Sequence, residues 1–237
     1  MNQETTVVRP TSFSPARAVA GLAVMTVVSG AVLFGVAGTV AWPEAWIYLA
    51  VIVAVLGVYS AILLKVHPDL VAERSRPPAD AKKWDKPFVA IVGKLGPMAL
   101  LIVCALDRRF GWSGQAGAWV PLLGLLMVTG GGSLSAWAVA SNRFFSAVIR
   151  IQHDRGHHVI DTGPYRFVRH PGYLGSIFHM FGTALTLSSW WGLAVALLLS
   201  SVLAVRAALE DMTLQAELDG YTGYARRVRS RLVPGVW

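Results

Sequence analysis

The stretch EAWIYLAVIVAVLGVYSAILLKV, residues 44–66, decides the fold class of this chain. Its only charged residues, Glu44 and Lys65, stand near its two ends. A helix needs about 20 mostly apolar residues to cross the hydrocarbon core of a bilayer. The whole chain agrees with this stretch, because 54% of its residues are hydrophobic and only 14% are charged, against about 25% in soluble domains. The sequence therefore predicts an all-α, polytopic integral membrane protein.

Further apolar stretches on both sides predict more spans, at residues 17–40, 88–106, 118–140, 173–187 and 190–208. The first is too long for a signal-peptide core, so we expect a retained helix. The stretch at 88–106 is interrupted by Lys94, Gly96 and Pro97, which predicts a kink. We expect about six transmembrane helices, or five if this segment only dips into the membrane.

Two short motifs predict how the later spans pack. The run GGGS at residues 130–133 lacks bulky side chains and would let another helix approach closely. The turn SSWW at residues 188–191 is too short for anything but a helical hairpin between the last two spans.

Positive charge alternates between the loops. Residues 65–86 hold six Lys and Arg, residues 142–171 hold five, and the tail holds Arg226, Arg227, Arg229 and Arg231. The loops at 42–44 and 188–190 hold none, and the loop at 107–117 holds two. The positive-inside rule places both termini and both long loops in the cytoplasm, which predicts a multi-pass protein of the cell (inner) membrane. The net charge of +8 then reflects orientation and contact with anionic membrane lipids, not nucleic acid.

The polar stretch RIQHDRGHHVIDTGPYRFVRHPGYLG, residues 150–175, lies directly before a predicted helix. Pro171 suits the first position of that helix, and free backbone amides at residues 172–174 would favour an anion. Arg169 and His170 stand beside these amides and can together hold a carboxylate or phosphate. Tyr165 and Tyr173 offer flat faces for an adenine or a ribose. The alternative is that the cations only reach the headgroups and fix topology.

A second polar element, RAALEDMTL, ends the last span at residues 206–214. Arg206 and Glu210 are four residues apart and share one helix face. They form either a surface ion pair of little consequence or part of a site, because charges near a span are costly. The basic, aromatic tail after residue 220 either closes over the site or, as the sequence slightly favours, lies on the headgroups.

Several common chemistries lack their motifs. The histidines at 153, 157, 158 and 170 have no accompanying HExxH signature, so we expect no metal site. No nucleophile elbow, P-loop or dinucleotide-binding glycine motif occurs. The single cysteine, Cys104, excludes an intrachain disulfide and a cysteine-based metal cluster.

The order HHVIDTGPYRFVRHPGYLG, a helical hairpin, RAALEDMTL and YTGYARRVRSRLVPG resembles the isoprenylcysteine carboxyl methyltransferase family. Membrane phospholipid N-methyltransferases are similar over the same region. The resemblance covers residues 150–234, and the four N-terminal spans match only in hydrophobic character. Asp211 is a departure, because many members have a second Glu there.

This resemblance implies a single membrane methyltransferase domain over residues 1–237, with four N-terminal spans in 1–141 and a catalytic core in 142–237. It implies S-adenosyl-L-methionine as cofactor, bound in a cytosolic pocket beside the C-terminal hairpin. Arg206 and Glu210 would face the reacting group. The implied cofactor contacts are Gln152, His157, His158, Val159, Ile160, Tyr165, Arg169, His170, Pro171, Gly172 and Tyr173.

The acceptor remains open from sequence alone. The resemblance favours methylation of a carboxylate on a lipophilic small molecule or lipid-linked substrate. A phospholipid, an isoprenoid or a small thiol is an alternative acceptor. A small membrane transporter or partner subunit is the non-enzymatic alternative, but it would place charged residues along a path through the spans, and Lys94 is the only interior candidate.

Overall fold

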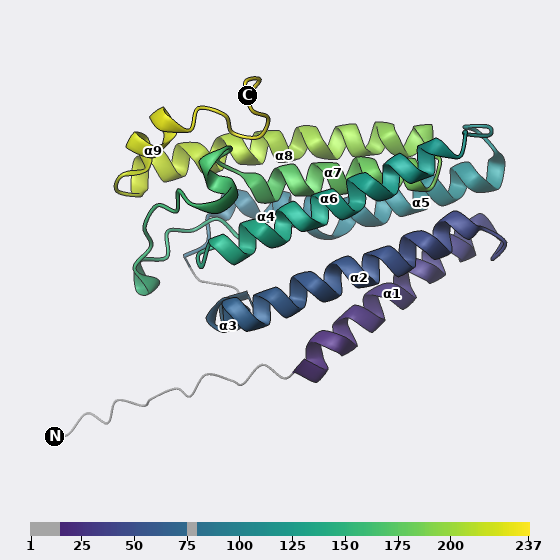
Figure 1. Cartoon of the computed structure of the whole chain (residues 1–237), viewed down its shortest axis with the longest axis horizontal. Helices are drawn as coiled ribbons and strands as arrows, with labels where there is room; N and C mark the ends of the chain where they lie inside the picture. The colour runs from purple at the N-terminus through teal and green to yellow at the C-terminus, as the bar shows by residue number, and fades with distance from the viewer. Residues whose placement is uncertain (1–14, 75–79) are drawn as a thin grey trace.

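The computed structural model describes residues 15–74 and 80–237, and within these ranges every regular element is helical. Figure 1 shows a bundle of long helices running roughly side by side. The elements are α1 (Pro15–Ala37), α2 (Pro43–Val66), α3 (Pro68–Arg74), η1 (Lys83–Asp85), α4 (Lys86–Ala90), η2 (Ile91–Leu95), α5 (Gly96–Phe110), α6 (Trp119–Ser141), η3 (His153–Arg155), η4 (Gly163–Arg166), α7 (Pro171–Thr186), α8 (Trp190–Glu217) and α9 (Tyr221–Arg227). The predicted all-α membrane fold is confirmed.

Five helical stretches in the described ranges are long and apolar enough to cross a membrane. They are Ala18–Ala37, Pro43–Val66, Lys83–Phe110, Trp119–Ser141 and Trp190–Glu217. The predicted spans at 17–40, 44–66, 118–140 and 190–208 are therefore present. The last of them continues nine residues further than the sequence predicted, to Glu217.

The third span is a continuous helical stretch of 28 residues with an irregularity where the sequence predicted one. Residues Ile91–Leu95 form a π-helical turn, in which the amide of Gly96 donates to the carbonyl of Ile91. Pro97 follows at once and has no amide hydrogen to donate. The wider turn accommodates this missing donor and lets the helix continue.

The predicted span at 173–187 is a helix, but a short one. Helix α7 has 16 residues, which corresponds to about 24 Å of length, whereas a hydrocarbon core is about 30 Å thick. It begins at Pro171, as predicted, and the turn after it leads directly into α8 at Trp190. The predicted C-terminal hairpin is confirmed. Of the six predicted spans, five are long enough to cross a membrane, and α7 is a shorter helix.

Glycines bring α6 and α7 into close contact. A Cβ atom on Gly131 would lie 2.4 Å from the carbonyl oxygen of Gly175, and one on Gly182 would lie 2.7 Å from the amide nitrogen of Val128. No side chain fits at either position, so the backbones touch directly, as in other membrane helix pairs. The predicted close approach of the 130–133 run is confirmed for Gly131.

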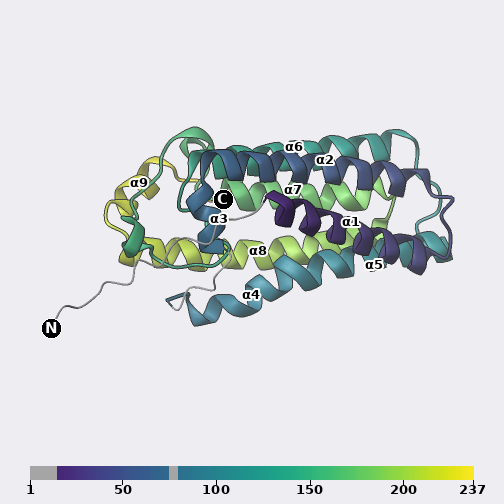
Figure 2. The ribbon, with the colours of Figure 1, turned by 90° about the horizontal axis from the view of Figure 1, so that it is seen from below.

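The long basic segments lie at one end of the bundle. Figures 1 and 2 show the ends of α2 and α8, the start of α4 and the segment 142–170 at this end, while the turns 38–42, 111–118 and 187–189 lie at the other. Residues 75–79 of the basic loop predicted at residues 65–86 lie outside the described residues. The polar segments are thus gathered on one side, as the charge pattern predicted.

Candidate active site

A pocket opens at this end of the bundle, between the segment 142–160, the start of α7, the end of α8 and α9. It encloses about 850 Å³, part of which is open to solvent. Every residue that the sequence suggested for the site lines it: Gln152, His157, His158, Val159, Ile160, Tyr165, Arg169, His170, Pro171, Gly172, Tyr173, Arg206 and Glu210. The fold thus gathers into one cavity residues that are spread over almost 60 positions of the sequence.

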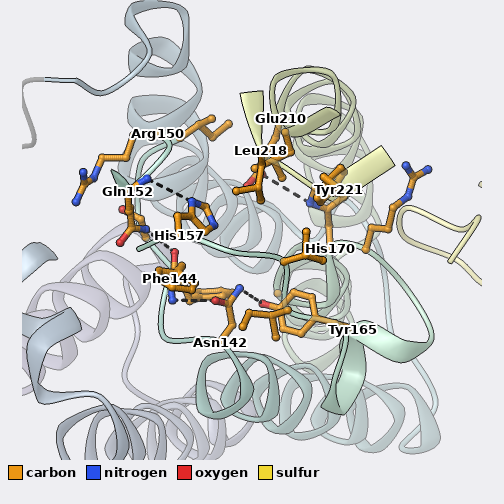
Figure 3. Close-up of a pocket in the computed structure, with 18 of the residues that line it drawn as sticks. Asn142, Phe144, Arg150, Gln152, His157, Tyr165, His170, Glu210, Leu218 and Tyr221 are labelled. Carbon is orange, nitrogen blue, oxygen red and sulfur yellow. Dashed lines mark hydrogen bonds and ion pairs between the residues drawn. The ribbon is translucent and has the colours of Figure 1, made fainter. Parts of the chain in front are cut away.

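One wall of the pocket is built from the segment that follows α6. The Gln152 side chain donates from Nε2 to the carbonyl of Phe144 (2.7 Å) and accepts at Oε1 from Arg155 (2.5 Å). The ring of His157 lies against the ring of Phe144, with centroids 4.5 Å apart. Figure 3 shows Phe144, Gln152 and His157 on the same side of the pocket. This wall therefore offers a flat, largely apolar face.

His157 is a neutral imidazole at physiological pH. Burial, together with the nearby charges of His158 and Arg150, lowers the pKa of its ring from 6.5 to about 4. Its Nδ1 accepts a hydrogen bond from the amide of Gln152 (3.3 Å). A neutral ring adds no positive charge to the pocket, which favours a cationic ligand.

The opposite wall begins with α7. A Cβ atom on Gly172 would lie 2.5 Å from the ring of Phe145, so only glycine fits between the helix and that ring. The expected row of free amides is shorter than predicted, because the amides of Tyr173 and Leu174 both donate to the carbonyl of His170. The prediction of an anion site along residues 172–174 is therefore wrong for two of its three amides.

Arg169 forms an intramolecular ion pair with Asp211. Its Nη1 lies 2.7 Å from both carboxylate oxygens of Asp211, and its Nη2 donates to the carbonyl of Arg229 (3.0 Å). Asp211 is fully buried and also accepts from Tyr221 (3.0 Å). The guanidinium of Arg169 thus fastens the C-terminal segment to the pocket wall, a use that the sequence did not suggest.

Arg206 and Glu210 both line the pocket but do not pair with each other. Arg206 binds Asp85, with Nε 2.7 Å from Oδ1 and Nη2 2.9 Å from Oδ2. Glu210 accepts a hydrogen bond from the hydroxyl of Tyr173 (2.6 Å), and His170 Nδ1 lies 3.7 Å from the same carboxylate. The alternative of a simple surface ion pair between Arg206 and Glu210 is therefore wrong.

Sequence reasoning missed Asp85 and the contribution of the tail. Asp85 is 1% exposed, although the charge pattern placed its segment in a long cytoplasmic loop. Tyr221 and Tyr224 of α9 line the pocket, and the Tyr224 hydroxyl donates to the carbonyl of Tyr165 (2.8 Å). The favoured headgroup placement is therefore wrong for this part of the tail, which closes over the site. A lone acid among lysines next to a span was the available signal for Asp85.

Two buried polar atoms of the pocket wall have no hydrogen-bond partner within the described residues: Nε of Arg169 and Nε2 of His170. Buried polar atoms of this kind are uncommon unless a ligand or water reaches them. No group of three or more metal-binding side chains occurs in the described part of the chain. The two nitrogens of Arg169 and His170 therefore leave positions for a ligand with polar atoms along this edge of the pocket.

Comparison with known proteins supports the resemblance seen in the sequence. Residues 119–217 match the phospholipid methyltransferase family. A probable protein-S-isoprenylcysteine O-methyltransferase from rice (Oryza sativa subsp. indica) is 34% identical over 117 residues, which are 48% of this chain and 61% of the rice protein. Protein-S-isoprenylcysteine O-methyltransferase B from Arabidopsis thaliana is 30% identical over 115 residues, 47% of this chain and 58% of that protein.

The fold is also similar to a solved structure, that of the eukaryotic intramembrane Ras methyltransferase ICMT (isoprenylcysteine carboxyl methyltransferase). The TM-score is 0.65 at 18% identity, and the match covers 93% of this chain and 77% of the other. At this identity the likeness concerns the fold. The sequence matches span about 60% of the length of the plant proteins.

Proposed function

We propose that this chain, whose residues 119–217 match the phospholipid methyltransferase family, is an integral-membrane methyltransferase that uses S-adenosyl-L-methionine and acts on a lipophilic acceptor. One observation carries the proposal. The cofactor and catalytic residues implied by the resemblance all line a single pocket, which includes residues from the C-terminal part of α8. A polar cofactor and a membrane-dissolved acceptor can meet only at a membrane boundary.

The residues of the pocket fit S-adenosylmethionine. The rings of Phe144, His157 and Tyr165 supply flat faces for the adenine, and the imidazole of His170 supplies polar atoms in the pocket wall. Gly172 keeps the wall free of a side chain where Phe145 already stands. We propose the cofactor contacts to be Gln152, His157, His158, Val159, Ile160, Tyr165, Arg169, His170, Pro171, Gly172 and Tyr173, with Arg169 acting through its buried Nε or its backbone.

The charges near Arg206 suit a cationic cofactor. Arg206 is neutralised by Asp85, while Glu210 adds a negative charge whose one hydrogen bond among residues 15–74 and 80–237 comes from Tyr173. The cofactor, when bound, supplies an electrophilic methyl group on a sulfonium. The chain itself has to align donor and acceptor and exclude water, because the positive charge disperses as the methyl moves.

Arg206 and Glu210 are the proposed catalytic residues. A carboxylate acceptor needs no base, and Arg206 can hold it by hydrogen bonds from its guanidinium. An amine or thiol acceptor must lose a proton, and Glu210 can accept it. The relatives named for isoprenylcysteine favour carboxylate methylation at a lipid-linked cysteine or a similar lipophilic acid. The family match named for phospholipids makes an amine headgroup the second candidate.

Binding of S-adenosylhomocysteine, measured by calorimetry on detergent-purified protein, tests the pocket. His170→Ala and Tyr165→Ala should each weaken binding, whereas Phe167→Ala, at an exposed position beside them, should not. Unchanged binding in both pocket variants would remove the assignment. Incubating membranes with methyl-labelled cofactor and identifying the labelled product by mass spectrometry would then name the acceptor.

A further inference from the structure

We infer that Asp85 is a positioning residue of this site: its carboxylate holds the guanidinium of Arg206 in place and cancels its charge where the sulfonium binds. Asp85 lies in η1, more than 30 residues before the family match begins. The inference rests on the proposed function and deepens it, because it extends the site to the start of the third span.

Asp85 occupies only some of the hydrogen-bond donors of the Arg206 guanidinium. An Arg guanidinium has five N–H groups. The Nε group and one Nη2 group of Arg206 donate to Asp85, and the second Nη2 group donates to the carbonyl of Ala147 (3.0 Å). Within the described residues, only the two hydrogens on Nη1 have no protein partner. The ring of Tyr173 packs against the same guanidinium, with its centroid 5.3 Å from Cζ. Asp85 thus fixes one edge of Arg206, and Nη1 is what remains for a ligand in the pocket.

Asp85 is itself held from two directions. Its Oδ2 accepts the amide of Ile149 (2.9 Å), a residue that lines the pocket. The backbone of the same short segment pairs with this wall, because the amide of Lys82 donates to the carbonyl of Ile149 (2.9 Å). The carboxylate is therefore rigid, and a rigid carboxylate can orient a guanidinium without itself touching the ligand.

The charge of Asp85 has a second consequence. A bare guanidinium beside the pocket would repel the sulfonium of S-adenosylmethionine, whereas S-adenosylhomocysteine carries a neutral sulfur and is otherwise nearly identical. By Coulomb's law with an effective dielectric constant of about 20, two unit charges separated by roughly 12 Å interact by about 1.4 kcal/mol, so loss of one negative charge at a separation of that order changes binding of a cation about tenfold. A merely structural role for Asp85 would weaken both ligands alike. The ratio of the two dissociation constants therefore separates the two roles.

The test compares Asp85→Asn with the matched control Lys82→Gln. Lys82 stands three residues earlier and ties the same segment to α8 through Glu217 (2.7 Å), but that pair is exposed and outside the pocket. Binding of S-adenosylmethionine and of S-adenosylhomocysteine is measured by calorimetry on detergent-purified protein. We expect Asp85→Asn to raise the ratio of the two dissociation constants about tenfold, equivalent to about 1.4 kcal/mol, and Lys82→Gln to leave it unchanged.

A double variant keeps the test decisive if Asp85→Asn alone is unstable. Asp85→Asn with Arg206→Gln removes both charges, so the ratio should return to the wild-type value while methyl transfer stays low. A ratio that is unchanged in Asp85→Asn, or failure of both variants to fold, would make Asp85 a structural residue and overturn the inference. Wild-type protein that binds neither ligand would overturn the proposed function first.

Discussion

Replacement of Asp211 by Asn should release the C-terminal segment from the pocket. Asp211 is fully buried and is contacted by Arg169, Arg231, Gln215 and Tyr221. These partners come from four parts of the chain, and two of them, Arg231 and Tyr221, follow the end of α8. The single carboxylate therefore fastens the tail that closes the site. Asn keeps the size of the side chain and removes its charge.

The size of the stability loss depends on which partners of Asp211 are exposed to solvent. The side chain of Arg169 is only 7% exposed and would be left as an unpaired buried cation, whereas Arg231 is 28% exposed and can be hydrated. Removing one partner of a buried ion pair costs about 3–5 kcal/mol. We expect a loss of about 3 kcal/mol, because only Arg169 bears the full cost. An exposed pair such as Lys82 with Glu217 contributes less than about 1 kcal/mol, so Glu217→Gln is the control.

Limited trypsin digestion in detergent, read by mass spectrometry, measures this loss locally. In Asp211→Asn, cleavage after Arg226, Arg227 and Arg229 should accelerate by roughly 100-fold, the factor that corresponds to about 3 kcal/mol when opening is fast relative to cleavage. Cleavage in Glu217→Gln should stay within a few-fold of wild type. Equal protection of the tail in Asp211→Asn and wild type would refute the reasoning that this carboxylate holds it.

Three further predictions concern other parts of the structure. Gly172→Ala should weaken S-adenosylhomocysteine binding at least tenfold by forcing the ring of Phe145 into the pocket, with Gly223→Ala, which has open space, as the control in calorimetry. The pKa of His157 is lowered to about 4, so its contribution to stability is present above pH 6.5 and is lost as the pH falls towards 4. Thermal melts of His157→Gln should therefore show a smaller decrease in melting temperature between pH 6.5 and pH 4 than wild type. Gly131→Leu should separate α6 from α7 and lower the melting temperature by several degrees, whereas Gly130→Leu, which meets no neighbour, should not.

Hydropathy predicted the fold well because lipid imposes a simple rule. Backbone groups in a bilayer must be paired within the segment, so long apolar stretches become helices almost regardless of detail. The same rule explains the π-helical turn, since Pro97 had to be accommodated without breaking the helix. The rule does not fix helix length. Hydropathy therefore counted α7 as a span and ended α8 too early, at residue 208.

The site was predicted only where the motif is local. Tyr165, His170 and Tyr173 lie within nine positions of one another, and Arg206 and Glu210 share one helix turn. Asp85 and Asp211 could not be assigned in this way, because their importance depends on which cations the fold brings to them. Asp85 meets Arg206 from 121 positions away. Such ion pairs matter because both partners are buried, and the neighbouring residues in the sequence do not reveal whether an acid is buried.

The unequal arms of the C-terminal hairpin explain why the pocket lies where it does. Both arms start from the same turn, but α7 has 16 residues and α8 has 28, so α8 extends about 18 Å beyond the start of α7. Arg206, Glu210 and Leu214 project from this overhang and line the pocket above the first residues of α7. The space beside the overhang is filled by the segment 142–160 and by α9 instead of another span. A short α7 is therefore a requirement of the site, because a full-length helix would occupy the cavity in which cofactor and acceptor are proposed to meet.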